Sequence, residues 1–239
     1  NVAIGHSALA SNTTASDNVA VGKDCLLSNT TGGFNVAVGV NALDANTTAS
    51  ENVAIGRDSL GANTTGTANV AVGTFALRDN VTGDDNTAVG KNALLENEAS
   101  NNTAVGKSAL QANTTGAENV AVGALALDAC TTGETSTAVG YQALTAMTTA
   151  AGVTAVGQKA GGSLTTGNQN TLIGVVAGFE ITTGTNNLCL GSRAGRGASP
   201  SGQITTGSNN VVLGDNDISN LFCADTSISA SDSRDKTDI

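Results

Sequence analysis

The chain is built from one short segment repeated along its length. Near-copies of Asn1-Val2-Ala3-Ile4-Gly5 begin at residues 18, 35, 52, 69, 86, 102, 119, 136, 153, 170, 187 and 210. The spacing is seventeen residues, except for one unit of sixteen (86 to 102) and one of twenty-three (187 to 210). A period this short and constant indicates a solenoid, in which each coil buries its apolar face by stacking on its neighbours. Positions are numbered below from the first residue of each unit, so Gly5 is at position 5.

Each unit predicts one strand and two corners. Val2-Ala3-Ile4 is β-prone, and its alternation predicts that Val2 and Ile4 point into the coil. Gly5 recurs in all thirteen units, which indicates a positive φ or a backbone contact too close for a Cβ. Asn12-Thr13-Thr14 has the composition of a corner, and no helical period is sustained anywhere. We therefore predict an all-β parallel β-solenoid of about thirteen coils over residues 1–214.

The composition predicts a thin core and association between chains. Aromatic residues make up only 2% of the sequence, which leaves Val, Ala, Ile and Leu to fill the interior. Each coil offers about three large apolar residues against the backbone entropy of seventeen, so an isolated chain is expected to be marginal. Ala3 has counterparts in ten of the thirteen units, on the strand face opposite Val2 and Ile4. We expect this Ala column to allow close contact between copies; the alternative is a small exposed residue on a β-surface.

The apolar residues change position along the chain. Early units carry Leu at position 9, whereas Gly161, Gly178 and Gly195 occupy it later. The later units instead carry Leu164, Ile181 and Ile204 near position 12. Because volume lost at one wall must be replaced at another, the cross-section should change between about residues 125 and 165. The short unit predicts a tightened corner and a local kink near 96–101, and the long unit predicts a protruding loop or a bulge over 193–203.

Charge and apolar content restrict the partners. The net charge is −10, with 10 Lys and Arg against 20 Asp and Glu, so no basic stripe is available for nucleic acid. No run approaches eighteen apolar residues, so we expect no membrane insertion through a helix. The sequence begins inside a repeat without a signal peptide, which suggests part of a longer protein.

Four cysteines stand at non-equivalent positions, more than thirty residues apart: Cys25, Cys130, Cys189 and Cys223. Three of them occupy small or apolar positions of the coil, which favours buried free thiols over disulfides. Their spacing fits no zinc pattern, and we expect neither a metal nor a cofactor.

Other polar residues have structural explanations. His6 aligns with a column of variable residues, so we expect it to be exposed and assign it no catalytic role. Asp215 and Asp217 could contribute to a Ca²⁺ site, but a turn is the favoured interpretation because the remaining ligands are missing. Asn-x-Thr sequences recur at the corner, beginning at Asn12, and are interpreted as turn residues rather than glycosylation sites.

Two resemblances bear on function. Units of the form Asn-Val-Ala-Val-Gly followed by Ala-Leu resemble the heads of trimeric autotransporter adhesins, which are left-handed parallel β-rolls, and the tail fibres of bacteriophages. The C-terminal Ser231-Asp232-Ser233-Arg234-Asp235-Lys236, with Ile239 after it, is similar to the opening of the endosialidase-type intramolecular chaperone of phage fibres. That resemblance divides the end of the chain into a cap and linker (215–230) and a truncated chaperone start (231–239).

The chaperone resemblance also implies a chemistry. In that family the domain trimerises, guides folding of the fibre and cuts itself off. The implied nucleophile is Ser231, the implied base is Lys236, and the implied cleavage lies between Ala230 and Ser231. A Ser hydroxyl needs a base to take its proton, and a desolvated Lys can do so. Without the body of the chaperone, we expect this chain to be inert.

The combined expectation is a homotrimeric section of a phage tail fibre in the virion. It would contact other tail proteins and attach to a host cell-surface receptor, either a glycan or an outer-membrane component. The alternative is a trimeric adhesin head on a bacterial surface. A polysaccharide-degrading spike is less favoured because acidic pairs in a groove and aromatic sugar platforms are missing. Ice binding through the Thr13-Thr14 columns is also less favoured, since an Asn-flanked turn is not flat. We expect no enzyme activity other than self-cleavage.

Overall fold

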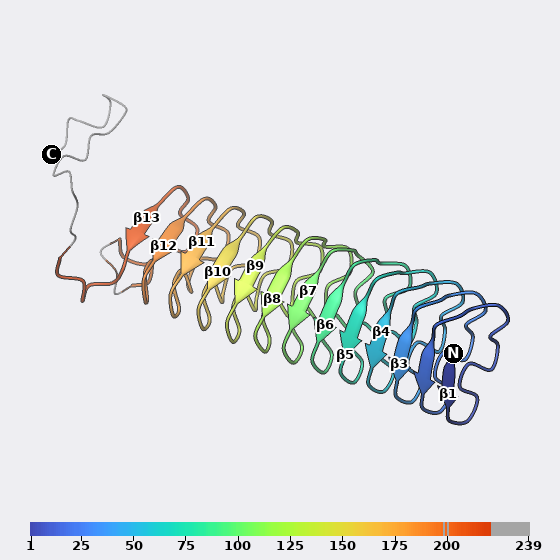
Figure 1. Ribbon diagram of the computed structural model, residues 1–239. Helices are drawn as coiled ribbons and strands as arrows, with labels where there is room; N and C mark the ends of the chain where they lie inside the picture. The colour runs from blue at the N-terminus through green and yellow to red at the C-terminus, as the bar shows by residue number, and fades with distance from the viewer. Residues whose placement is uncertain (198, 200, 221–239) are drawn as a thin grey trace.

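The chain forms a continuous stack of coils. The structure is a computed structural model and describes residues 1–197, 199 and 201–220. Thirteen strands form one parallel sheet in the order β1 to β13, and the described residues contain no helix. Figure 1 shows the coils following one another along a single axis, with the N-terminus at one end and β13 at the other. The predicted all-β parallel β-solenoid is confirmed.

Every strand is three residues long. The strands are β1 (Val2–Ile4), β2 (Val19–Val21), β3 (Val36–Val38), β4 (Val53–Ile55), β5 (Val70–Val72), β6 (Thr87–Val89), β7 (Thr103–Val105), β8 (Val120–Val122), β9 (Thr137–Val139), β10 (Thr154–Val156), β11 (Thr171–Ile173), β12 (Leu188–Leu190) and β13 (Val211–Leu213). Each pairs with the next at equal positions, including Thr87 with Thr103 across the short unit. The shortened corner is bridged by a hydrogen bond from Glu98 N to Thr114 O at 3.0 Å, so the sheet continues without a break where a kink was predicted.

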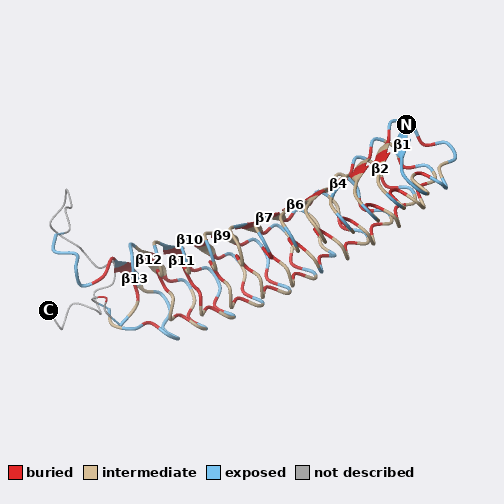
Figure 2. Cartoon of the chain, turned by 90° about the horizontal axis from the view of Figure 1, so that it is seen from below, coloured by how far each residue is buried: buried red, intermediate tan, exposed pale blue. Residues whose placement is uncertain are grey.

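The strands face the opposite way from the sequence prediction. The middle residue is buried in β2 to β13, and Ala20, Ala37 and Ala54 have no exposed surface. The first and third residues of each strand point outward and remain partly exposed, as Val2 and Ile4 do at 49% and 60%. The physical reason is space, because the coil is thin and the buried Leu and Asn side chains leave room for only a methyl group at most strands. Figure 2 shows the same alternation of buried and exposed residues in each coil.

Position 5 requires glycine for both of the predicted reasons. Gly56 has φ +137°, in the region that L residues rarely adopt. A Cβ on Gly56 would also lie 2.6 Å from the carbonyl carbon and oxygen of Gly73 in the next coil. The backbone therefore turns at position 5 and contacts its neighbour there directly.

Buried asparagines form two ladders through the coil interior. At position 12, each side-chain Nδ2 donates to the Oδ1 of the preceding coil, as Asn46 does to Asn29 at 2.9 Å. This position-12 ladder consists of Asn12, Asn29, Asn46, Asn63, Asn80, Asn97 and Asn113. At position 1, each Oδ1 accepts the backbone N–H of the next unit, as Asn18 accepts from Asn35 at 2.9 Å. The position-12 residues, predicted to be turn residues, are therefore also part of the core.

The predicted relocation of core volume is confirmed. Leu77 and Leu164 are both fully buried although they occupy positions 9 and 12. A Cβ on Gly161 would come within 2.7 Å of side-chain carbons of Leu144 and Leu172, so both side chains occupy the space that a position-9 leucine would take. Leu172 stands where most strands have Ala, which shows that the strand position also gains volume as position 9 loses it.

The last coil ends in an ionic cap. Arg193 Nε lies 2.7 Å from Asp215 Oδ2, and its Nη2 lies 2.7 Å from Asp217 Oδ2. The longer unit folds back through short-range hydrogen bonds, and the Ile204 N–H bonds to the Gly195 carbonyl at 3.1 Å. Ile204 is 6% exposed, so the chain rejoins the core immediately after the insertion.

Candidate interaction surfaces

The outward side of the sheet forms a uniform surface that runs from β1 to β13. It is formed by the first and third residues of every strand, which are Val, Ile, Leu or Thr in all thirteen cases. No charged residue interrupts it. Ile55, Val122 and Ile173 are 40%, 36% and 39% exposed, and many of their neighbours are half-buried. We call this surface the sheet face; it could bury apolar area against a partner without desolvating a charge.

Exposed residues on either side of the sheet face differ in charge. The residue at position 17, just before each following Asn, includes Asp17, Glu51, Asp85 and Glu118, and we call this column the acidic margin. The residue just after the position-5 glycine includes Lys23, Arg57, Lys91 and Lys107, and we call this column the basic margin. Beyond these residues both margins are largely uncharged. The sheet face is thus bordered by opposite charges over much of its N-terminal half.

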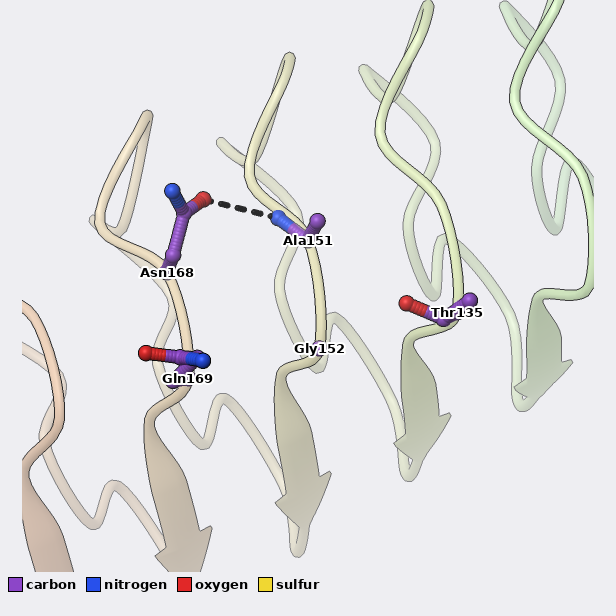
Figure 3. Close-up of a pocket in the computed structure, with 5 residues that line it drawn as sticks. All are labelled: Thr135, Ala151, Gly152, Asn168 and Gln169. Carbon is purple, nitrogen blue, oxygen red and sulfur yellow. Dashed lines mark hydrogen bonds between the residues drawn. The ribbon is translucent and has the colours of Figure 1, made fainter.

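A shallow hollow interrupts the uncharged part of the position-17 column. Thr135, Gly152 and Gln169 follow one another in adjacent coils, and the missing side chain at Gly152 leaves a space of about 300 Å³ (Figure 3). The upper wall is fixed by Asn168, whose Oδ1 accepts a hydrogen bond from the Ala151 N–H at 2.9 Å. No titratable side chain lines the hollow, so it offers shape and hydrogen bonds but no acid or base.

A second hollow of about 320 Å³ lies nearer the C-terminal end of the same column. Its amide side chains include Asn186 and Asn209, which are joined by a hydrogen bond of 2.8 Å. Thr171, Leu188 and Val211 of the sheet face complete it. The hollow is therefore continuous with the sheet face, and its chemistry is that of hydrogen bonding and apolar contact.

The Thr corner uses one of its two hydroxyl columns internally. Thr13 Oγ1 donates to the Thr30 carbonyl at 3.0 Å, and the equivalent bond recurs in most coils. The neighbouring column, which begins at Thr14, is exposed. It is interrupted in the short unit, where Glu98-Ala99 replaces the Thr pair.

The cysteines of the rod are chemically protected. Cys25, Cys130 and Cys189 are free and fully buried, as predicted. Burial raises the pKa of each thiol to about 11, so the nucleophilic thiolate is scarce at neutral pH. Cys223 lies outside the described residues.

His6, Asp215 and Asp217 can be placed individually. The side chain of His6 is 79% exposed and its Nδ1 lies 3.7 Å from Asp24 Oδ1. Asp215 and Asp217 are engaged by Arg193 rather than free for a cation. Within the described ranges no three His, Cys, Asp or Glu side chains converge as metal ligands would.

Several sequence predictions concern other parts of the chain or its surface chemistry. Ser231 and Lys236 lie outside the described residues, so their suggested pairing stays a prediction. Asn29, Asn46 and Asn63 spell glycosylation sequons but are fully buried in the position-12 ladder, where a glycan would not fit. No helix in the part of the chain that the structure describes has the length and apolarity to cross a bilayer.

Comparison with known proteins adds no relative. Neither the scan against family models nor the searches of curated proteins and of solved structures returned a match.

Proposed function

We propose that this chain is a structural and adhesive section of a fibre that attaches to a cell surface, of the kind found in bacteriophage tails. The observation that carries the proposal is the uninterrupted in-register stack from β1 to β13, which builds a rod rather than a compact domain around a site. A parallel solenoid presents extended columns of side chains, and extended surfaces are what such folds use for binding.

The chemistry of the described residues favours binding over catalysis. The thiols are buried, His6 is solvated, and the hollows contain amides, hydroxyls and apolar groups. Glycans are recognised by such amides and hydroxyls, and a glycan or another outer-membrane component is the receptor class we propose. The resemblance of the units to adhesin heads and phage fibres supports the same function.

We further propose that the rod acts as a homotrimer. The sheet face is uncharged along its whole length and mostly apolar, which is the property of a surface that is covered in an assembly. A thin single-coil core supports this, because association would add the burial that each coil lacks. Light scattering that gives a stable folded monomer at micromolar concentration would contradict the trimer.

Attachment is tested with the fluorescently labelled chain on a panel of bacterial strains. We expect saturable binding to some strains, with the heat-denatured chain as the control. Periodate treatment of the cells should abolish binding if the receptor is a glycan, and protease treatment should abolish it if the receptor is an outer-membrane protein. Absence of saturable binding across the panel would overturn the attachment function.

A second experiment separates the phage fibre from the adhesin alternative. The chain is joined after Ile239 to a chaperone domain of the family that its C-terminus resembles. The phage interpretation expects cleavage between Ala230 and Ser231, which Ser231→Ala and Lys236→Ala should each block. Intact-mass spectrometry decides the matter, and an unchanged cleaved mass in Ser231→Ala would show that the proposed dyad is wrong.

A further inference from the structure

We propose that the sheet face binds a second copy of this chain in parallel and in register, with the acidic margin of one copy against the basic margin of the next. The inference rests on the self-associated rod proposed above and adds its polarity, its register and the residues that meet. The supporting observation is that the two margin residues that flank the same strand are complementary at several successive strands of the chain.

A layer is one strand with its two margin residues. Three of the five layers between β2 and β8 that have a charged margin residue carry opposite charges on their two margins: Asp17 and Lys23 at β2, Glu51 and Arg57 at β4, Asp85 and Lys91 at β6. At β7 and β8 the charged residue, Lys107 or Glu118, lies across the strand from a neutral one. The margins of one layer are six residues apart along a segment that turns at the position-5 glycine, so they lie at most roughly 20 Å apart. Among the described residues no ion pair joins the two margins of one layer, and Lys23 and Arg57 pair instead with the adjacent Asp24 and Asp58. Attraction within one chain therefore does not explain the matching.

The layers between them are matched in a different way. At β3 the margin residues are Phe34 and Val40, both apolar and 62% and 43% exposed. At β5 they are Ala68 and Thr74, both small. From β2 to β6, charge is therefore paired with charge, apolar with apolar and small with small, although the two residues of each pair lie on opposite sides of the strand.

Only one relative orientation brings these pairs together. When two rods lie parallel, related by rotation about an axis along the rod, the margin that precedes the strands of one copy meets the margin that follows the strands of the other. Asp85 of one copy then lies beside Lys91 of the next, and Phe34 beside Val40. An antiparallel arrangement places acidic margin against acidic margin, where repulsion opposes contact. A shift of one coil replaces the three opposite-charge contacts by a single Lys–carboxylate contact, between Lys107 and either Asp85 or Glu118.

The hollow at Gly152 fits the same arrangement. Gly152 and Gln158 flank β10, and Thr135 and Tyr141 flank β9. In the parallel in-register contact, Gln158 of the next copy approaches the hollow at Gly152, and its Tyr141, 47% exposed, lies one layer away. The C-terminal half, where the margins lose their charges, thus offers complementary shape instead.

Charge exchange at β6 tests the polarity. Asp85 and Lys91 are both exposed, and neither takes part in an ion pair among the described residues. Asp85→Lys alone and Lys91→Asp alone should each weaken assembly roughly tenfold at low salt, because each creates a like-charge contact. The double variant should recover assembly, since the exchanged charges meet again between copies. Glu96→Lys, the same charge change at an exposed residue of the same coil outside both margins, should leave assembly unchanged.

Disulfide trapping tests the register. In a Cys223→Ser background, separate Ala68→Cys and Thr74→Cys chains are folded together and oxidised. The protected thiols at Cys25, Cys130 and Cys189 should remain reduced. We expect crosslinks between the two kinds of chain and none within either kind alone. Ala68→Cys chains that crosslink to themselves, or assemblies that never crosslink, would overturn the proposal.

Sedimentation and cell binding distinguish this inference from the attachment function. A chain that attaches to cells but sediments as a monomer overturns self-association and leaves attachment standing. An assembly in which the charge exchange does not recover association overturns the matched margins, whatever its binding to cells.

Discussion

Leucine at position 9 is held in a backbone conformation that leucine rarely adopts. Leu77 has φ +50° and is fully buried, and the position-9 leucines from Leu9 to Leu144 share this region. Gly161 and Gly178 take over the same position with φ +60° and +58°. The left-handed region disfavours residues with a Cβ by about 1 kcal/mol or more. Burial of the leucine side chain offsets this strain in the early coils, and glycine removes it where the core is filled from elsewhere.

This strain predicts an unusual order of stability for substitutions of Leu77. Leu77→Ala should cost about 2 to 5 kcal/mol, as expected for a fully buried leucine. Leu77→Gly should cost no more than Leu77→Ala, because glycine relieves the positive φ even though it removes one further carbon. The free energy of unfolding from urea titration measures both. The control is Ala76→Gly, which lies outside the positive-φ region and should be destabilising in the usual way. A Leu77→Gly protein clearly less stable than Leu77→Ala would contradict the argument.

The asparagines in the middle and at the end of the position-12 ladder differ in how many hydrogen bonds their Oδ1 atoms accept. Asn46 Oδ1 accepts only from Asn63 Nδ2, at 3.2 Å. Asn97 Oδ1 accepts from both Asn113, at 2.7 Å, and Asn102, at 3.2 Å. Asn113 Oδ1 has no donor, since the next coil has Cys130 at this position. The ladder therefore ends on an amide oxygen without a donor. Replacing the asparagine at that end should cost less folding stability than replacing one in the middle.

Cysteine substitutions test this difference, with Cys130 as the natural precedent at position 12. Asn63→Cys should cost about 1 to 3 kcal/mol, because it leaves the buried Asn46 Oδ1 without a donor. Asn113→Cys should cost much less, since Asn97 keeps its bond from Asn102 and the orphaned oxygen is removed. Urea denaturation at pH 7 compares the two. Equal losses would mean that the amide ladder contributes through packing alone.

At the scale of the element, the cap on the last coil couples stability to pH. The pKa of Asp215 lies below its usual value because the carboxylate accepts the backbone N–H of Asp217 at 3.1 Å and the Arg193 guanidinium at 2.7 Å. A lowered pKa means that the folded state favours the charged carboxylate. The contribution is therefore complete above the unfolded value of 3.8 and is lost as the pH falls through the lower folded value.

The difference in melting temperature between wild type and Asp215→Asn isolates this contribution. It should be positive and constant between pH 5 and 7, and should shrink as the pH falls below about 4. Asp217→Asn is the matched control, because Asp217 is 82% exposed and its pair with Arg193 should contribute little. A difference that stays constant down to pH 2 would show that the cap does not depend on the carboxylate.

The sequence predicted the strands and their parallel stacking, but not which face of each strand is buried. The period and the glycine at position 5 were sufficient for the parallel stack, because each reports a demand that every coil repeats. The prediction that Val2 and Ile4 lie inside was wrong, since alternation alone does not say which face of a strand is buried. The Ala column, expected to contact other chains, is instead the interior of the coil.

The asparagine ladders could have been suspected from the constancy of Asn at position 12 over seven consecutive units. Turn propensity gave an equally simple explanation, because a single unit does not reveal that its amide bonds to the unit before it. The two margins could not be located from the sequence for the same reason. Asp85 and Lys91 flank one partly exposed strand only once that strand is known to be three residues long with its first and third residues outward.

At the scale of the whole molecule, the rod is close to one-dimensional, so a complete coil should be removable. Excision of residues 51–67 deletes the layer of Glu51 and Arg57 and leaves Ser50 followed by Ala68, with the later units in phase. Each coil contacts only its neighbours, so the shortened rod should fold and lose about one coil's share of stability. Assembly among shortened chains should be normal, because all copies lose the same layer.

The excision should weaken assemblies that contain both full-length and shortened chains. Beyond the deletion, Asp85 of a shortened chain would lie opposite Thr74 of a full-length chain, and Lys91 opposite Ala68, so the charges at β6 lose their partners. The shift also brings Lys107 of one chain opposite Asp85 of the other, which offsets part of this loss. Co-expressed full-length and shortened chains with different tags should therefore mix less than statistically, which tandem affinity purification and native mass spectrometry would reveal. Two full-length chains with the same two tags provide the control and should mix statistically. Statistical mixing of the long and short chains would mean that the margins do not set the register, and that the sheet face associates through its apolar surface alone.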